Sequence, residues 1–238
     1  MKILAAILIM GLFIVSCDIN YEDSVSGNGK VITLQVNTDT IRQIIVSDKL
    51  DVTLVPSDSV KVLLKADENL HDVIKITAEN GILRVSSSKY IRIARSKEVI
   101  VYGRTINKVE ASLRATVITR DTISCDDFIL NTSSGTDAKI SGHFKSCTVN
   151  SRSGSSVNLE GKTDYLNINA SSASDIFGYN FEAIRADVIA SSASNVQISI
   201  LGEAHLNASS AADIKYKGVP RLMDSKSSSL GEIRQARF

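Results

Sequence analysis

The amino-acid sequence predicts an all-β protein: a right-handed parallel β-helix, or solenoid, with some antiparallel strands in its amino-terminal half. Three observations carry this prediction. Five copies of one short segment follow each other from residue 128, and apolar and polar residues alternate within each copy with the period of a β-strand. Further upstream, Asn80-Gly81 separates two alternating segments, as in a tight hairpin. We expect residues 30–238 to form a single solenoid domain.

The chain opens with a segment typical of bacterial export. Lys2 supplies a positive charge, and residues 3–15 form an apolar run that is too short for a membrane-spanning helix. The tetrapeptide Ile-Val-Ser-Cys that follows, ending at Cys17, resembles a bacterial lipobox. We therefore predict a lipoprotein signal peptide at residues 1–16, lipidation of Cys17 and a polar tether at residues 17–29. An ordinary secretory signal followed by a chance cysteine is the alternative.

This prediction places the protein on a membrane through its lipid anchor. Two or three acyl chains on one cysteine hold a protein stably, where a single chain does not. We expect a protein anchored in the outer membrane, on the cell surface or facing the periplasm.

The amino-terminal half consists of short alternating segments without helical periodicity. Between residues 30 and 107 these read VITLQV, LDVTLV, VKVLLKA, VIKITA, ILRVSS and EVIVYG. Asn80-Gly81 lies between two of them and favours the positive φ angles of a type I′ turn, so at least one antiparallel pair is expected. Residues 108–123 resemble a degenerate early copy of the repeat, with Ala115 to Val117 at its corner.

Each repeat contains a turn of small polar residues, and we take the second of them as an anchor. The anchors are Ser134, Ser153, Ser172, Ser192 and Ser210, with spacings of 19, 19, 20 and 18 residues, and a degenerate sixth copy has its anchor at Ser227. Mostly apolar residues stand six and four positions before each anchor and four and six after it. Each copy is therefore predicted to be two short strands around a corner, and stacking at about 4.8 Å buries a shared interior.

Two columns of residues are predicted to lie at the corners. The residue after the anchor is small, which we attribute to the lack of side-chain room where identical bends stack; this column contains Gly135, Gly154, Ala173, Ala193 and Ala211. Three positions before the anchor, asparagines recur, and in-register amides are expected to hydrogen-bond up the stack. These are Asn131, Asn150, Asn169 and Asn207, with Ile189 interrupting the series.

A third column, three positions after the anchor, is the candidate for a ligand-facing ladder. It reads Asp137, Ser156, Asp175, Asn195 and Asp213. A carbohydrate-active β-helix enzyme needs clustered carboxylates. Carboxylates two coils apart are separated by roughly 9–10 Å, which is loose for a shared calcium ion and wide for an acid/base pair. The favoured interpretation is a structural ladder in which each side chain bonds to nearby backbone N–H groups.

Charge and motifs argue against several classes of function. Lys+Arg number 27 and Asp+Glu 26, and loss of Lys2 with the signal peptide leaves 26 against 26. That balance gives no attraction for a phosphate backbone, and 5% aromatic residues offer few stacking partners, so we predict no nucleic-acid partner. The three histidines are isolated, and no zinc, P-loop, dinucleotide or nucleophile-elbow motif occurs. We predict no catalytic residue, no metal and no cofactor.

Cys125 and Cys147 lie 22 residues apart in an exported chain, so a disulfide between them fits the compartment. They do not occupy the same position of the repeat, however. Two buried free thiols that fill apolar space are the favoured interpretation.

Taken in order, these motifs resemble one known family. The lipobox is followed by IIVSDKLDVTL (residues 44–54), by VKVLLKA, by GILRV and by the repeated Ser-rich turns. This order resembles the putative auto-transporter adhesin head GIN domain family of Bacteroidetes-type bacteria, over roughly residues 30–225. The resemblance implies a β-helical fold, an envelope location and an adhesive role, and it implies no catalytic residues. The alanines at three corners depart from the glycine usual there.

We therefore expect a non-catalytic envelope adhesin that binds a surface glycan or a host or envelope protein. The alternatives are a pectin-lyase-like enzyme and a purely structural periplasmic lipoprotein. Asp-Ser/Thr-aliphatic tripeptides, the form modified by O-glycosylation systems in such bacteria, place candidate acceptors at Ser24, Thr40, Ser59 and Thr122.

Overall fold

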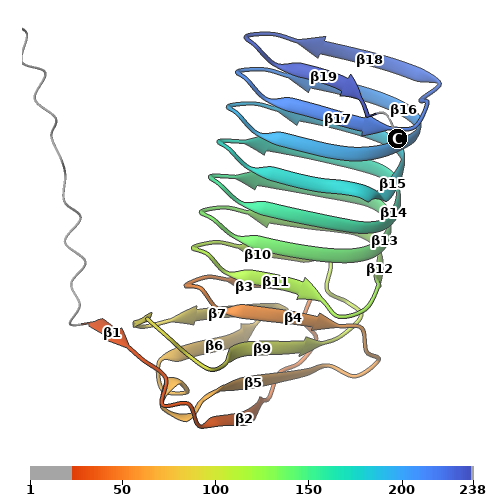
Figure 1. The fold of residues 1–238 in the computed structure, drawn as a ribbon. Coiled ribbons are helices and arrows are strands. Elements are labelled where there is room, and N and C mark those ends of the chain that lie inside the picture. The colour runs from red at the N-terminus through yellow and green to blue at the C-terminus, as the bar shows by residue number, and fades with distance from the viewer. Residues whose placement is uncertain (1–22, 237–238) are drawn as a thin grey trace, which may run out of the picture.

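Stacked coils of β-strand make up the part of the chain that is described, residues 23–236 of a computed structural model (Figure 1). The predicted signal peptide and Cys17 lie outside the described residues. The strands of the amino-terminal half are β1 (Ser24–Val25), β2 (Val31–Val36), β3 (Gln43–Val46), β4 (Asp51–Val55), β5 (Lys61–Asp67), β6 (Ile74–Glu79), β7 (Ile82–Ser87), β8 (Tyr90–Ile91) and β9 (Lys97–Tyr102). The coils continue with β10 (Lys108–Ala111), β11 (Thr116–Thr119), β12 (Ile123–Thr132), β13 (Asp137–Arg152), β14 (Ser156–Ser171), β15 (Asp175–Ala190), β16 (Asn195–Ala208), β17 (Asp213–Lys217), β18 (Leu222–Ser227) and β19 (Glu232–Gln235).

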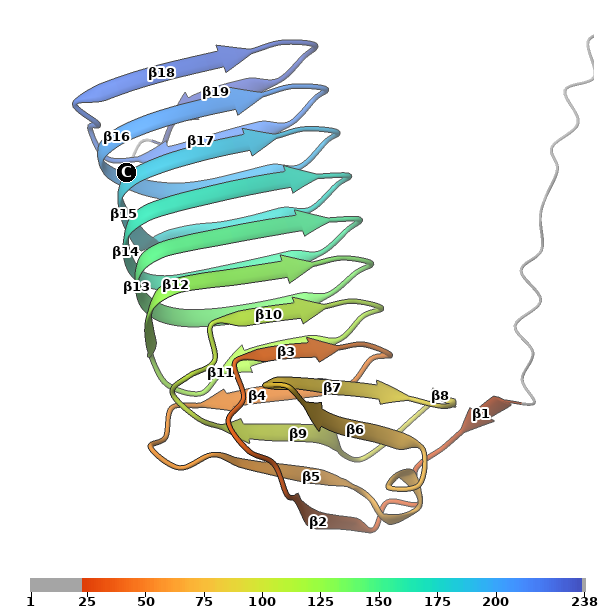
Figure 2. The ribbon, with the colours of Figure 1, turned by 180° about the vertical axis from the view of Figure 1, so that it is seen from behind.

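The long strands wind into a right-handed parallel solenoid, as predicted. β12, β13, β14, β15 and β16 pair in parallel, each with the next. In Figure 1 the corners are at the left, and the strands on the near side run from the corners towards the right. Each successive coil lies higher, towards the carboxy-terminal end. In Figure 2, from behind, the strands again run left to right, now towards the corners. Chain that moves rightward on whichever side is nearer while it climbs follows a right-handed coil.

Each coil has one sharp corner and one smooth bend; two strands flank each corner as predicted, but the expectation that they are short is wrong. β13, β14 and β15 are each 16 residues long and run from one corner to the next. At the far edge the chain bends near Gly142 while its ladder to β14 continues from Gly142↔Gly161 to Ser146↔Tyr165. The bend has no Ser-rich turn: two in-register glycines, Gly142 and Gly161 (φ +117°), lie at it, and neighbouring coils bend together and keep the ladder bonds.

The corners are type I′-like turns in which two successive residues have positive φ. The pairs are Asp48/Lys49, Leu113/Arg114, Ser134/Gly135, Ser153/Gly154, Ser172/Ala173, Ser192/Ala193, Ser210/Ala211 and Ser229/Leu230. Their backbones bond up the stack, for example from the Gly154 N–H to the Ser172 carbonyl at 3.0 Å. All five predicted anchors thus lie at corners. The expected corner at Ala115 to Val117 lies instead at Leu113/Arg114, and the sixth anchor is Ser229 rather than Ser227.

The reason we predicted for the small corner residues is also wrong. A Cβ atom built on Gly154 would meet nothing within 4 Å, and one on Gly135 would meet only the Arg114 side chain at 3.5 Å. Space is therefore available. Glycine is favoured because its φ angles there, +69° and +72°, lie in the left-handed region that costs an L-residue free energy. Ala173 and Ala193 adopt the same conformation with φ of 57° and 60°.

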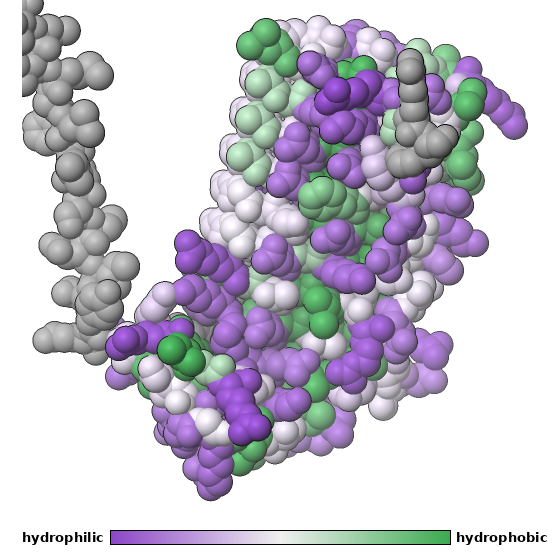
Figure 3. Space-filling view, in the orientation of Figure 1, coloured by the Kyte–Doolittle hydropathy of each residue, from purple (hydrophilic) through white to green (hydrophobic). Residues whose placement is uncertain are grey.

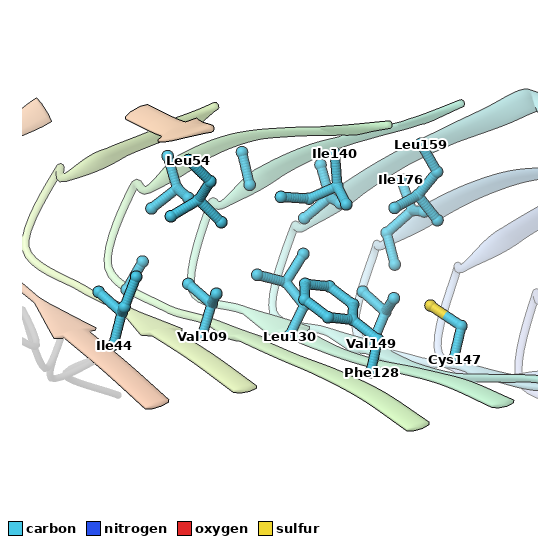
Figure 4. Packing of buried hydrophobic residues seen from close by; sticks show 14 of the residues in the cluster. Ile44, Leu54, Val109, Phe128, Leu130, Ile140, Cys147, Val149, Leu159 and Ile176 are labelled. Atoms are coloured by element: carbon cyan, nitrogen blue, oxygen red, sulfur yellow. The ribbon is translucent and has the colours of Figure 1, made fainter. Parts of the chain in front are cut away.

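The core lies between the two walls of each coil, where the predicted apolar columns face each other (Figure 4). Leu130 and Val149 on the wall before the corner, and Ile140 and Ile176 on the wall after it, are 0% exposed. At the smooth bend, the Phe128 and Phe144 rings stack with centroids 4.7 Å apart. Alternating inward residues of successive coils thus share one continuous interior, which is what stabilises units that could not fold singly.

The amino-terminal end of the solenoid is covered by antiparallel strands. β5 pairs with β2 and β9, and β6 pairs with β7 through a turn at Asn80 (φ 52°) and Gly81 (φ 78°), which confirms the predicted hairpin. β3 and β4 belong to the coils, because they pair in parallel with β10 and β11. The fully buried Asp67 carboxylate accepts backbone N–H bonds from Gly29, Arg95 and Ser96 and thereby ties the covering loops together.

Candidate functional site

A polar groove runs along the outer wall that precedes the corners. Its volume is about 620 Å³. Strands β3, β10, β12, β13 and β14 line it in that order, because each is paired with the next. We call it the asparagine groove; its lining includes Ile45, Glu110, Ser112, Asn131, Asn150, Arg152, Asn169 and Ser171.

Three of the four predicted corner asparagines form a hydrogen-bonded ladder inside this groove. Asn150 Nδ2 donates to Asn131 Oδ1 at 2.8 Å, and Asn169 Nδ2 donates to Asn150 Oδ1 at 3.0 Å. The expected amide ladder is therefore present over three coils. A primary amide carries two N–H donors and one acceptor oxygen, and one such ladder bond uses a single N–H of the Asn150 amide. The other N–H of Asn150 is available to a ligand in the groove.

The ladder ends where the sequence breaks it. Ile189 follows Asn169 in register and is 53% exposed, so it places an apolar side chain on the outer wall. Asn207 comes next in the same column, beyond Ile189, and is not part of the groove lining. The four asparagines of one sequence column thus divide into three groove residues and one outside it.

The groove has little net charge. Glu110 pairs with Lys108 Nζ at 2.7 Å and accepts a hydrogen bond from Gln43 Nε2 at 3.1 Å. Its charge is therefore balanced within the protein. Arg152, which is exposed, adds a guanidinium to the lining. Hydroxyls, amides and one guanidinium are groups that recognise a polar, uncharged ligand by hydrogen bonds.

Several groove residues were not identified from the sequence. Ile45 and Glu110 enter the lining only because β3 and β10 stack in parallel on β12, with Ile45↔Glu110↔Asn131 in register. Ile45 lies outside the repeats, and Glu110 lies only in the degenerate copy at 108–123. The signal that could have found them is the pattern ASLRA at 111–115, which is a corner without the Ser-Ser-Gly sequence.

The acidic column is in register as predicted, from Asp137 through Ser156, Asp175 and Asn195 to Asp213. Its bonding differs from the expected bonds between each side chain and nearby backbone N–H groups. Asn195 Nδ2 donates to Asp175 Oδ1 at 2.7 Å, so the contact joins two coils by side chains. Asp213 lies 2.7 Å from Arg234 Nη2 and 3.0 Å from Lys215 Nζ.

These contacts set the chemistry of the column. Burial raises the pKa of Asp213, but the hydrogen bonds from Arg234 and Lys215 outweigh it and hold that pKa below its ordinary value. A carboxyl of this kind stays ionised and acts as a charged anchor, whereas a general acid needs a raised pKa. On this face, polar side chains surround an apolar stripe along the coils (Figure 3); Ile118 and Phe177, of the wall after the corners, are 39% and 40% exposed. Among residues 23–236 no cluster of three or more metal-binding side chains occurs.

The two cysteines are free thiols in the structure; Cys147 is buried as expected, whereas Cys125 is only half-buried, contrary to the expectation of two buried thiols. Cys147 is fully buried in the column opposite Phe128, and Cys125 lies opposite Phe144, so the two occupy different positions of the coil. Burial raises the pKa of the Cys147 thiol to about 12. Burial, together with Asp127 and Asp126, raises that of Cys125 to about 11. Both thiols are therefore protonated at neutral pH and are poor nucleophiles.

Three of the four candidate glycosylation sites are exposed. Thr40, Ser59 and Thr122 lie in loops between strands, and Ser24 is half-buried in β1. Thr122 Oγ1 is 3.2 Å from Ser141 Oγ. Their modification stays a prediction. None of the helical segments within the described range has the length and apolar content needed to cross a membrane.

Comparisons with known proteins agree with this architecture. Residues 40–220 match the family described as "Putative auto-transporter adhesin, head GIN domain". A putative adhesin from Bacteroides fragilis is similar in structure, with a TM-score of 0.79 and 17% identity over 89% of this chain and 100% of that one. A putative adhesin from Parabacteroides merdae gives a TM-score of 0.73 and 20% identity over 90% of this chain and 100% of that one.

A third structure carries a different description. It is a putative lipid binding protein from Parabacteroides distasonis, with a TM-score of 0.74 and 15% identity over 90% of this chain and 100% of that one. A comparison with curated protein sequences gives no match. At these identities the structural likeness shows the fold.

Proposed function

Because the chain belongs to the putative auto-transporter adhesin head GIN domain family, we propose that it is a non-catalytic cell-envelope adhesin that binds a glycan along the asparagine groove. The observation that carries the proposal is the amide ladder of Asn131, Asn150 and Asn169, which lies in a groove of about 620 Å³.

The chemistry of the groove suits a sugar chain. Vicinal hydroxyls of a pyranose both donate and accept hydrogen bonds, and amides and serine hydroxyls complement both roles. The ladder repeats these groups once per coil, at the strand spacing of about 4.8 Å, which is comparable to the length of one sugar unit. Many hydrogen bonds of modest strength suit a neutral glycan, and the pairing of Glu110 to Lys108 leaves the groove without a strong field for a charged ligand.

The same proposal includes a lipid anchor at Cys17, on the outer membrane. Its support is the lipobox-like tetrapeptide that ends at this cysteine. Cells that express the chain and are fed labelled palmitate should incorporate label, and Cys17→Ser should abolish incorporation. Protease treatment of intact cells then separates the two sides of the membrane, because a chain that stays intact faces the periplasm.

A glycan-array screen tests the binding role. The fragment that begins at Asn20 contains every described strand and the whole core, so it is the suitable soluble probe. We expect it to bind one class of neutral glycan, and we expect Asn150→Ala to lose that binding. Asn207→Ala is the matched control, because it removes the same side chain from the same column outside the groove. Binding that is equal in both variants would place the ligand elsewhere.

The enzyme alternative has its own test. Purified protein is incubated with a panel of uronic-acid polysaccharides, and cleavage is followed by the appearance of reducing ends or unsaturated products. Sustained cleavage that Asp175→Ala abolishes would overturn the non-catalytic proposal. Capture of a protein ligand by the groove, with no glycan bound, would replace the sugar with a protein partner.

A further inference from the structure

The carboxy-terminal end of the solenoid is an open sheet edge. Among the strands of residues 23–236, β18 pairs only with β16 and β19 only with β17, so both present their other side to solvent. The inward-facing Met223 and Ile233 are only half-buried, since no described coil covers them. The amino-terminal end differs, because antiparallel strands cover it there (Figure 1). An uncovered edge of this kind is a template for another strand.

The backbone pattern shows which groups are free at this edge. The N–H of Ser228 bonds to the Ala208 carbonyl, and the N–H groups of Glu232 and Ala236 bond to Ala212 and Tyr216. Alternate residues of a parallel strand point to opposite sides in the sheet plane. The even-numbered residues of β18 and β19 therefore bond inward to the stack, and the N–H and C=O groups of Ser225 and Ile233 point outward.

Charge decides how a second copy can pair there. A two-fold axis at Ser225 makes β18 antiparallel to itself and places Asp224 directly opposite Lys226 of the second copy, twice. Moving the two-fold axis to residue 224 or to residue 226 instead sets Asp224 against Asp224 or Lys226 against Lys226. Both side chains are exposed, and the Asp224 carboxylate is 3.9 Å from His205. Opposite charges across an antiparallel pair stabilise it, and like charges destabilise it.

The charges on β19 favour the same kind of register between two copies. An axis at Ile233 places Glu232 opposite Arg234 twice and brings the two inward-facing Ile233 side chains together, whereas an axis at residue 232 or 234 opposes Glu232 to Glu232 or Arg234 to Arg234. Within its own chain Arg234 also bonds to Asp213 at 2.7 Å and lies 3.5 Å from Glu232, so the second copy extends an existing network of charges. Ser225 lies four residues before Ser229 of the last corner, and Ile233 three residues after Leu230. The two positions are therefore at similar distances from the corner, and one axis passes close to both.

We propose that two copies of this chain associate end to end through β18 and β19, each pairing antiparallel with its own equivalent, in the register that joins Asp224 to Lys226 and Glu232 to Arg234. The dimer continues both walls of the solenoid and covers Met223 and Ile233. Its two amino-terminal ends face away from each other. This association is independent of the asparagine groove, which lies on β3 to β14.

Sedimentation velocity of the fragment from Asn20 onward, over about 5–200 µM, tests the proposal. We expect a reversible dimer. Lys226→Asp should weaken it about tenfold or more, because two attractive pairs become two repulsive ones. The double variant Asp224→Lys/Lys226→Asp should restore it, because the pairs re-form with exchanged charges. A wild-type monomer throughout this range, or a double variant no tighter than Lys226→Asp, would overturn the proposal.

Ser225→Pro gives a second, backbone-level test. Its N–H points away from β16, so proline removes no bond within the chain and is tolerated on an edge strand. The variant should remain monomeric with an unchanged circular dichroism spectrum. If Ser225→Pro does not fold, the charge-exchange variants still decide the matter. Dimerisation of folded Ser225→Pro with wild-type affinity would contradict pairing at this edge.

Discussion

Gly154→Ala separates two explanations of the small corner residues. If stacked bends left no side-chain room, the added methyl group would clash; instead, its Cβ would have no neighbour within 4 Å. The left-handed conformation, φ +69°, is then the sole source of any cost. An L-residue pays about 1–2 kcal/mol for this region, and alanine recovers about 0.4–1 kcal/mol through the smaller entropy of its unfolded chain. We expect a net destabilisation of about 1 kcal/mol.

Thermal unfolding followed by circular dichroism measures this effect. For a domain of this size, about 1 kcal/mol corresponds to a fall in Tm of roughly 2–4 °C. The reciprocal variant Ala173→Gly, at a corner with φ of 57°, should raise Tm by a similar amount. An unchanged Tm for Gly154→Ala, or a lower Tm for Ala173→Gly, would refute the conformational explanation.

Three further predictions concern other parts of the coil. Gly161→Ala should cost about 3 kcal/mol or more in unfolding free energy, because its φ is +117° and the new Cβ would lie 2.0 Å from the Gly142 carbonyl oxygen; a urea midpoint equal to wild type would exclude this. Asp67→Asn should destabilise by about 2–4 kcal/mol at pH 7, since an amide cannot accept all three backbone N–H bonds. Burial raises the pKa of Asp67, but the backbone bonds from Gly29, Ser96 and Arg95 hold it below its ordinary 3.8. The carboxylate therefore stabilises the fold above about pH 4 and loses this effect as pH falls through its lowered pKa, so the gap between wild type and Asp67→Asn should narrow below pH 4. In the native fragment, Cys147 should not react with a thiol reagent at pH 8, because it is 0% exposed with a pKa of about 12; mass spectrometry that finds native Cys147 labelled as fast as in urea would contradict this.

The coils could be predicted because one spacing organises both apolar and polar columns. The residues four before the five anchors, Leu130 to Leu206, are all at most 2% exposed. Asn80-Gly81 likewise predicted its hairpin, since few dipeptides accept two positive φ angles. Each of these features is local or strictly periodic, so the sequence alone reveals it.

The length of the strands and the early corners could not be predicted in the same way. The smooth bend near Gly142 and Gly161 carries no Ser-rich turn sequence, and the strand continues through it because neighbouring coils maintain the ladder bonds. Asp48/Lys49 and Leu113/Arg114 make the corner without glycine. Since long side chains such as Lys49, Leu113 and Arg114 are uncommon at positive φ, the stacking of these corners on later ones explains them.

The asparagine groove could be predicted from the sequence only in part. Its ladder of Asn131, Asn150 and Asn169 follows from the repeat, and both its hydrogen bonds are present. The other side of the groove depends on Ile45 and Glu110, which reach it through parallel pairing across more than one coil. Such residues cannot be assigned to the groove until the register of the strands is known.

Calorimetric titration of the best glycan from the array into wild type, Asn150→Ala and Asn207→Ala tests the proposed binding role most directly. Loss of one or two hydrogen bonds to the ligand should weaken binding by Asn150→Ala about tenfold or more. Asn207→Ala should bind as wild type does, because Asn207 lies outside the groove. Equal affinity for all three proteins would contradict recognition by the amide ladder.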